Sequence, residues 1–400
     1  MASKEPLLFL CHRIPFPPNK GDKIRSFNML KALSKTFDVY LACFVDDPYD
    51  WQYAHKLDKF CQQKLLLKQD KTIAKIKGLQ AFITGQAISL PYYFSRKMED
   101  WVTKTQAAHG IENIFIFSSS MAQYVESDAY SACCRIIDFV DVDSDKWQQY
   151  AMSKRGLARW VYLREWRKLQ IFENRIAEEF DHSLFVSPQE ANLFKQQIPA
   201  KVAAKVSGML NGVDTEFFDP KNSDIQHIDE SIDVVFTGAM DYWANVDAVI
   251  WFSDKVWPLV KATYPKASFF VVGGNPSSQI KALDGQLGIK VTGRVLDVRP
   301  YIRSAKVVVA PLQIARGLQN KILEAMSMAK PVVATRMAIE GIEARNEEIR
   351  ICDNAQEFSQ QVINYLNQPT YAAHNRTWIL ENLQWQSSLF RLPHLFKDAQ

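Results

Sequence analysis

Runs of apolar residues alternate with amphipathic segments along this chain, and the alternation occurs twice. The first series of apolar runs covers residues 7–12, 37–44, 113–117, 135–140 and 183–187. Between these runs, residues 24–35 and 151–180 have the spacing of amphipathic helices. Uninterrupted Val, Ile, Leu and Phe runs are typical of strands covered on both faces. The series therefore predicts a parallel sheet between two layers of helices.

The pattern restarts after a break between about residues 200 and 230. The second series of apolar runs covers residues 232–238, 268–274, 289–293, 306–312 and 331–335, with a helical segment at 246–262. Two such series predict an α/β protein with two Rossmann-like domains that face each other across a cleft. We expect residues 1–205 to form the first domain and residues 206–375 the second.

Composition narrows the class of protein. With 400 residues and 47% apolar content, the chain exceeds what one hydrophobic core normally supports, which agrees with two domains. A net charge of +4 is too small to indicate nucleic-acid binding. Six cysteines occur without a CxxC pair or a zinc-type His spacing, so we expect reduced core thiols. No run is long enough for a secretory signal or a spanning helix, and we expect a cytoplasmic protein.

The loops that follow the strands hold the unusual residues of the chain. Ligands of open α/β sheets bind beyond the carboxyl ends of the strands. After the first strand comes NKGDKIR, where Gly21 permits a tight turn and the following helix start offers N–H groups to an anion. We expect this loop to contact the acceptor or a phosphate through Gly21, Asp22, Lys23 and Arg25. In the second half, Gly238 and Arg294 occupy strand exits in the same way.

The stretch ARGLQNKILEAMSMAKPVVAT, residues 315–335, places polar residues directly before a buried helix and strand. A helix that begins near Leu318 to Asn320 points unpaired N–H groups outward, and Lys321 adds a positive charge. This combination predicts a phosphate pocket. Glu324 lies one turn further, where a carboxylate can accept hydrogen bonds from ribose hydroxyls. Alternatively, Glu324 is an ordinary acid near a helix start and Lys321 its surface neighbour.

The order of motifs in the second half resembles the retaining glycosyltransferases of family four, which have the GT-B fold. The resemblance rests on FTGAMDYWANVDAV, FFVVGG, VTGRVLDVRPYIRSAKVVVAPL and GLQNKILEAMSMAKPVVAT. It implies a nucleotide-sugar donor held by the second domain and an acceptor facing the first. It also implies a C-terminal crossover, residues 376–400, that packs back on the first domain, with 379–392 as its helix. Donor contacts then fall on Gly238, Arg294, Gly317, Leu318, Asn320 and Glu324.

The resemblance also implies a catalytic role for this motif. Family members carry two acids eight positions apart; Glu324 matches the second, and Arg316 stands in place of the first. Where many members have an Arg and a Lys after the first strand of the donor domain, this chain has Ala239, Met240 and Asn245. We therefore expect Lys321, Arg294 and Arg316 to supply the positive charge around the diphosphate.

PFPPNKGDKIRSFNMLKALS and DFVDVDSDKW give a narrower resemblance, to the bacterial sugar transferases associated with exosortase (PEP-CTERM) exopolysaccharide systems. This resemblance implies transfer from a UDP- or GDP-sugar to a glycan or polyprenyl-linked acceptor in exopolysaccharide synthesis. Configuration is retained, and neither metal nor cofactor is required. The acceptor proton then leaves with the departing phosphate, because stabilising the charge on the leaving group is the main catalytic demand.

Acids after the strand at 135–140 permit two interpretations. Asp141, with Asp138, Asp143 and Asp145, faces the strand-end side and can orient or deprotonate an acceptor hydroxyl. Equally, these acids cap the helix that follows and contact its basic residues. His12, at the end of the first strand, is either an acceptor contact or a packed polar side chain.

Two basic segments bear on partners. Residues 56–77 carry seven lysines, and residues 154–168 mix six basic residues with Trp160, Tyr162 and Trp166. Such mixtures attract anionic lipid headgroups, and solvated helix faces have the same composition. Because related transferases elongate lipid-linked acceptors, we expect a peripheral contact with the inner face of the cytoplasmic membrane.

Three other functions compete with a transferase. A non-catalytic nucleotide-sugar-binding protein would explain why Arg316 stands in place of a family acid. It would also explain why the Arg and Lys after the first strand of the donor domain are missing. A nucleotide-sugar epimerase agrees with the Asp run, but no His completes its acid–base pair. An NAD-linked oxidoreductase requires a GxGxxG fingerprint, and VVGGN at 271–275 lacks it.

Overall fold

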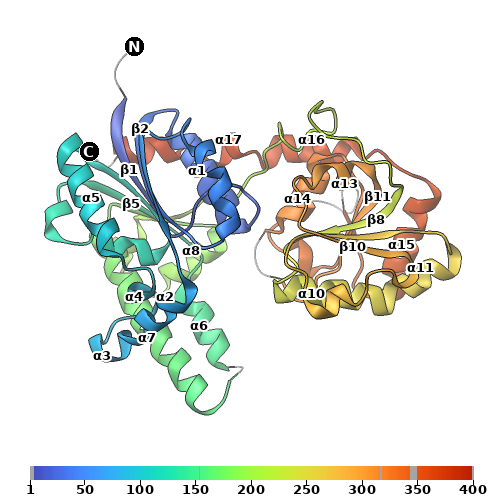
Figure 1. Cartoon of the computed structure of the whole chain (residues 1–400), viewed down its shortest axis with the longest axis horizontal. Coiled ribbons are helices and arrows are strands. Elements are labelled where there is room, and N and C mark those ends of the chain that lie inside the picture. Colours follow the sequence, from blue (N-terminus) through green and yellow to red (C-terminus); the bar gives the residue numbers. More distant parts are fainter. Residues whose placement is uncertain (1–3, 153, 316–317, 343–348, 399–400) are drawn as a thin grey trace. The chain divides into compact units, whose positions relative to one another are not determined.

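The computed structural model describes residues 4–152, 154–315, 318–342 and 349–398. The chain divides into two compact units (Figure 1). Unit 1 consists of Met1–Asn211 together with Ser388–Gln400, and unit 2 consists of Gly212–Ser387. Each unit is a parallel sheet with helices packed around it.

Unit 1 is built on a sheet whose described strands run in the order β3-β2-β1-β4-β5-β6-β7, all parallel. Its strands are β1 (Glu5–Cys11), β2 (Phe37–Val45), β3 (Gln63–Lys68), β4 (Asn113–Phe117), β5 (Cys134–Val140), β6 (His182–Phe185) and β7 (Val206–Gly208). Its longer helices are α1 (Gly21–Leu33), α2 (Lys71–Leu79), α5 (Arg96–His109), α6 (Asp143–Met152), α7 (Gly156–Glu179) and α8 (Pro188–Lys195), with short turns α3 (Ala81–Thr84) and α4 (Ser89–Tyr92).

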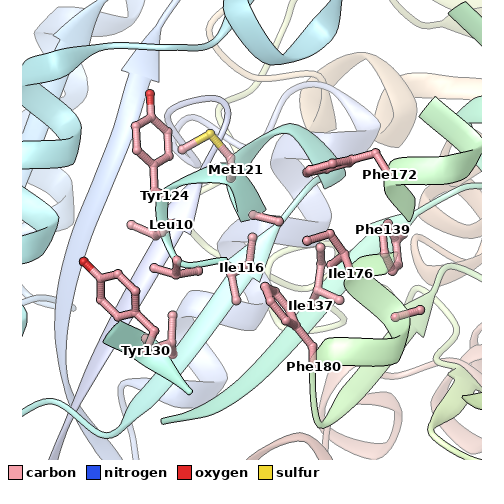
Figure 2. Packing of buried hydrophobic residues seen from close by; sticks show 14 of the residues in the cluster. Leu10, Ile116, Met121, Tyr124, Tyr130, Ile137, Phe139, Phe172, Ile176 and Phe180 are labelled. Atoms are coloured by element: carbon pink, nitrogen blue, oxygen red, sulfur yellow. The ribbon is translucent and has the colours of Figure 1, made fainter. Parts of the chain in front are cut away.

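The central strands of unit 1 are apolar on both faces because helices cover both sides. One layer of this core is shown in Figure 2, where Leu10, Ile116 and Ile137 from three strands meet Phe172 and Ile176 of α7. All five side chains are buried. At about 25 cal/mol per Å² of apolar surface, packing of this kind is the main contribution to the stability of the unit.

Unit 2 has the same plan. Its described strands run in the order β10-β9-β8-β11-β12-β13, all parallel. The strands are β8 (Ile232–Thr237), β9 (Phe269–Val272), β10 (Ile289–Gly293), β11 (Ala305–Ala310), β12 (Val332–Ala334) and β13 (Ile349–Ile351). The helices include α10 (Trp243–Trp251), α11 (Trp257–Thr263), α12 (Ser278–Lys281), α13 (Arg299–Ser304), α14 (Asn320–Ser327), α15 (Ala355–Asn367) and α16 (Ala373–Asn382).

Both sheets reverse their strand order at one point. In unit 1 the reversal lies between β1 and β4, and in unit 2 it lies between β8 and β11. Successive connections leave these strand pairs in opposite directions, which opens a crevice at the carboxyl ends. The predicted α/β fold with two Rossmann-like sheets is confirmed, and the reversals indicate where each unit can bind a ligand.

The C-terminal segment differs from the expected helix over 379–392. Helix α16 ends at Asn382 and packs on α14 within unit 2. The chain is then extended, because Gln384 pairs with Val213 and the Val213 N–H donates to the carbonyl of Leu383. After α17 (Trp385–Ser388), helix α18 (Leu392–Asp398) packs on α1 and β5 of unit 1. The return to unit 1 therefore begins at Ser388, later than the expected 376.

Candidate functional site

In unit 2, two strand-end loops touch through glycine backbones. Gly238 follows β8, and Gly273 follows β9. A Cβ atom on Gly273 would lie 1.6 Å from the carbonyl oxygen of Gly238, so no other residue fits there without moving the loop. The Met240 N–H donates to the carbonyl of Gly274 and joins the same two loops again. This close packing forms a backbone floor beside the reversal point.

Gly273→Ala should destabilise unit 2 by about 3 kcal/mol, because the added methyl meets rigid backbone instead of a movable side chain. Urea denaturation measures the loss. Gly293→Ala is the matched control: it also lies at a strand end, has a φ of 68°, and has open space around its Cβ position. Its cost should be only about 1 kcal/mol from backbone strain. Equal losses for both variants would show that the loop contact is unimportant.

Lys321 lies buried on this floor at the first turn of α14. Its Nζ donates to Oδ1 of Asn245, and the Nδ2 of Asn245 donates to the carbonyl of Ala239 at 2.9 Å. The ammonium also lies 4.4 Å from the ring centre of Phe236 in β8. A Cβ atom on Gly238 would lie 2.7 Å from Nδ2 of Asn245, so the glycine leaves room for the amide that holds the lysine. Within unit 2, Lys321 thus lies at the end of β8, one of the two strands at the reversal.

Glu324 follows Lys321 by one turn on the same helix and is half-buried. Burial lowers the pKa of Lys321 to about 7, and the neighbouring carboxylate offsets part of that shift. Burial likewise raises the pKa of Glu324 to about 7, against the pull of Lys321. Both groups change charge in the physiological range, as is typical of sites prepared for a charged ligand.

The other predicted donor residues lie around this pair. Asn320 begins α14, and among the described residues its buried Oδ1 has no hydrogen-bond partner, which leaves an acceptor available at the helix start. The Arg294 side chain lies against Gly274, and Leu318 lies against Gly341. The predictions for Arg316 and Gly317 fall outside the described residues. Gly238, Asn320, Lys321 and Glu324 therefore share the strand-end edge of unit 2.

The predicted acceptor loop of unit 1 is largely engaged in internal contacts. Arg25 is fully buried, and its guanidinium donates to Asp138 at 2.9 Å, to the carbonyl of Met209 at 2.7 Å and to Asn211 at 2.9 Å. Lys23 is buried in an ion pair with Asp50 at 2.9 Å. In this conformation both cations are closed to a ligand. These contacts favour a structural role in unit 1, and the contact of Lys23 and Arg25 with the acceptor stays a prediction.

His12, by contrast, belongs to a charged network at the end of β1. Asp22 lies 3.4 Å from its Nε2 and 2.7 Å from Nη1 of Arg13, whose Nε lies 3.1 Å from Asp46. Burial alone would lower the pKa of His12, but the hydrogen bond to Asp22 and the nearby negative charge raise it to about 9. The same cations hold the pKa of Asp22 well below its usual range, although burial opposes this. The contact with Asp22 thus favours the protonated form of His12.

A cavity of about 200 Å³ opens beside His12, at the carboxyl ends of β1, β4 and β5. Its wall includes Asp143, whose Oδ2 lies 3.5 Å from the Ser119 hydroxyl. Lys146 donates to Asp141 at 2.7 Å and to Oδ1 of Asp143 at 3.2 Å. A larger hollow of about 580 Å³ lies at the opposite, amino-terminal end of the sheet, where α/β folds do not usually bind ligands. The smaller cavity is lined by His12, Ser89, Tyr93, Ser118, Ser119, Ser120, Asp143, Trp147 and Leu169.

Sequence reasoning did not place several of these residues in a site. Ser118 to Ser120 follow β4 directly, and the strand-end rule predicts a ligand-binding position for such a loop. Gly273 and Tyr93 carry no signal of their own, because their positions depend on contacts with other loops. Among the described residues, no group of three or more His, Cys, Asp or Glu side chains is arranged to hold a metal ion.

The family model described as glycosyl transferases group 1 matches residues 231–368, which lie within unit 2. No curated protein sequence matches the chain significantly. Among solved structures, HepE of Anabaena in complex with UDP and glucose aligns with a TM-score of 0.66 at 14% identity, covering 98% of this chain and 100% of HepE. HepE has also been solved with UDP-glucose.

Two further solved structures have similar folds. Sucrose-phosphate synthase of Thermosynechococcus elongatus aligns with a TM-score of 0.67 at 15% identity, covering 99% of both chains. A mutant of TarM from S. aureus, solved with Fondaparinux, α-GlcNAc-glycerol and UDP, aligns with a TM-score of 0.64 at 11% identity and covers 98% of this chain and 99% of TarM.

These findings define the class. The two parallel sheets and their structural neighbours identify the GT-B fold. The segment of unit 2 that matches the model of the group 1 glycosyl transferases contains Gly238, Lys321 and Glu324. Together they support a glycosyltransferase of the GT-B type. In the part of the chain that the structure describes, no helix has both the length and the apolarity to cross a membrane.

Proposed function

We propose that this protein is a glycosyltransferase that moves a sugar from a nucleotide-diphosphate donor to a glycan or lipid-linked acceptor. The observation that carries the proposal is the pair of buried Lys321 and half-buried Glu324 near the strand-order reversal of unit 2, inside the segment that matches the group 1 glycosyl transferases. Crystals of HepE contain UDP-glucose, and we extend this donor class to the present chain as UDP- or GDP-sugars.

The diphosphate of the donor binds at the start of α14 in this proposal. The positive end of the α14 dipole points toward it, and Lys321 neutralises charge on the phosphates. Asn245 holds the ammonium in place through its side-chain oxygen. Glu324, one turn further, accepts hydrogen bonds from the ribose hydroxyls. Arg294, beside Gly274, and Arg316 supply additional positive charge.

Bond cleavage then depends on stabilising the leaving group. Breaking the bond between the sugar and the phosphate builds negative charge on the diphosphate, where Lys321 and the helix dipole lower the barrier. We propose that configuration is retained and that the acceptor hydroxyl loses its proton to the departing phosphate. Because Lys321 supplies charge that a divalent cation supplies elsewhere, we expect transfer to continue in EDTA.

The acceptor side of the proposal lies in unit 1. The cavity beside His12 contains hydroxyl, carboxylate and aromatic side chains, a mixture suited to a sugar or polyol. Both Asp141 and Asp143 accept from Lys146, but only Asp143 lines this cavity, so we propose Asp143 in place of Asp141 as the carboxylate that orients an acceptor hydroxyl. We propose a role in exopolysaccharide or other cell-surface glycan synthesis on the cytoplasmic side of the membrane.

Donor affinity should be greatest near pH 7. A bound diphosphate favours the protonated form of Lys321, so affinity falls as the pH rises above about 7 and the free lysine loses its proton. As the pH falls below about 7, Glu324 takes up a proton and accepts from the ribose less well. Lys321→Met should abolish the alkaline limb and Glu324→Gln the acidic limb, measured by calorimetric titration of UDP. A profile that is flat in the wild type contradicts both assignments.

A donor panel tests the reaction. The wild-type chain, Glu324→Ala and Lys321→Ala are incubated with UDP- and GDP-sugars, with EDTA, and with or without a polyprenyl-linked acceptor fraction. We expect acceptor-dependent nucleotide release from one donor, lost in both variants. If donors bind and none turns over, the chain is a nucleotide-sugar-binding protein. Conversion of one nucleotide sugar to its epimer without release would instead establish an epimerase.

A further inference from the structure

Unit 1 exposes a cluster of large apolar side chains that its own fold leaves uncovered. Helix α2 and turn α3 pack inward through the small residues Ala74, Gly78 and Ala81, and a Cβ atom on Gly78 would lie 2.9 Å from Ile88. The large residues face outward: Ile83 is 91% exposed and Ile76 63%. This arrangement is the reverse of an ordinary surface helix, whose large apolar residues face the core. Leu79 is exposed in the same way.

The hairpin of α6 and α7 continues this surface. Leu157 and Trp160, at the start of α7, are 76% and 55% exposed. Trp160 stacks on Phe82 of α3 with 6.2 Å between ring centres, and Arg164 donates to the carbonyls of Ala81 and Gln86. Figure 1 shows α2, α3, α6 and α7 together at one end of unit 1. We call this surface, formed by Ile76, Leu79, Phe82, Ile83, Leu157 and Trp160, the apolar tip.

The two segments that carry the apolar tip are strongly basic. Residues 71–88 and 154–168 together carry nine Lys and Arg side chains and one acid. The acid is Glu165, which is buried and accepts from the N–H groups of Ile88 and Ser89. Exposed positive charge at Lys75, Arg155 and Arg159 therefore meets no exposed acid from the same two segments. The lysines at 56–68 lie in β3 or just before it, outside the two segments that carry the apolar tip.

We propose that the apolar tip inserts into the headgroup region of an anionic lipid bilayer and docks unit 1 on the membrane. Apolar side chains ringed by Lys and Arg fit the boundary between acyl chains and negative headgroups. A second copy of the chain is a poorer occupant, because a self-complementary dimer would bring two sets of basic residues together. The inference does not depend on donor chemistry, since it concerns a different surface of the protein.

Vesicle co-sedimentation tests this inference on the full chain. Vesicles of phosphatidylglycerol and phosphatidylcholine in equal parts should bind the protein, and pure phosphatidylcholine should bind it at least about tenfold more weakly. The double variant Ile76→Asp/Ile83→Asp should lose about tenfold or more of its affinity for the anionic vesicles. Lys75→Gln/Arg155→Gln should lose a similar factor at low salt and less at high salt. Leu296→Asp, at an 88% exposed leucine of unit 2, is the matched control and should bind like the wild type.

Two results would overturn the inference. One is vesicle binding that is absent, or that the tip variants leave unchanged while their circular dichroism melting curves match the wild type. The other is a dimer seen by light scattering that the tip variants dissociate, which would assign the apolar tip to self-association. UDP titration of the same variants separates this inference from the proposed function, because the tip variants should bind UDP as the wild type does.

Discussion

Lys321→Met should reduce acceptor-dependent sugar transfer by about 100-fold or more at pH 7. The side chain occupies the end of β8 and the start of α14, held by Asn245, and in our account it is the main side-chain cation at the diphosphate. Methionine keeps the length and apolar packing of the stem beside Phe236 while it removes the charge. Steady-state nucleotide release with a saturating acceptor measures the effect.

The fold of this variant should be intact. Burial already disfavours the charged lysine, since its pKa is lowered to about 7, so removing the charge should leave the melting temperature unchanged or higher. Lys255→Met, at an exposed position of the same unit, controls for the loss of a positive charge and should transfer sugar at the normal rate. A Lys321→Met protein with full activity would remove Lys321 from the mechanism.

Arg25→Met should destabilise unit 1 by about 3–5 kcal/mol, because it leaves Asp138 buried without its cation. Both side chains are fully inaccessible, and burial raises the pKa of Asp138 even in the presence of the arginine. The variant also leaves the carbonyl of Met209 and the side-chain oxygen of Asn211 without this donor. Urea denaturation followed by circular dichroism measures the change.

Arg96→Met is the matched control for this prediction. Arg96 also forms ion pairs, with Glu99 and Asp100, but its side chain is 77% exposed on α5. Pairs at the surface contribute little, so this variant should lose less than about 1 kcal/mol. If Arg25→Met loses no more than the control, the buried pair is not structural, and a contact of Arg25 with the acceptor becomes the better explanation.

The alternation of apolar runs was sufficient to predict both sheets, because parallel strands covered on two faces leave an unbroken Val, Ile and Phe signature. The strands at 113–117 and 289–293 coincide with β4 and β10. Edge strands were harder to predict. β3, with the sequence QKLLLK, is only half-buried and lies in a lysine-rich segment. The break at 383–384 was invisible because its cause, the pairing of Gln384 with Val213, joins distant parts of the chain.

The sequence likewise predicts some residues of the candidate site and not others. Gly238, Lys321 and Glu324 were predictable because they lie at strand exits or one helical turn beyond, where position follows from local sequence. The contacts of Arg25 were not predictable, because its partner Asp138 lies 113 residues away in the sequence. The loop that resembles an anion site instead contributes Arg25 to a buried ion pair. The apolar tip was recognised only as basic segments, because sequence does not reveal that α2 packs through Ala74 and Gly78 and leaves Ile76 and Ile83 outside.

Calorimetric titration of UDP and GDP into the wild-type chain and Lys321→Met, in EDTA at pH 7, tests the central claim most directly. The claim is that unit 2 holds a nucleotide diphosphate at Lys321 and Glu324. We predict that one of the two nucleotides binds the wild type at a single site, with affinity at least about tenfold higher than for Lys321→Met. Binding of neither nucleotide, or equal binding to both proteins, would contradict the account.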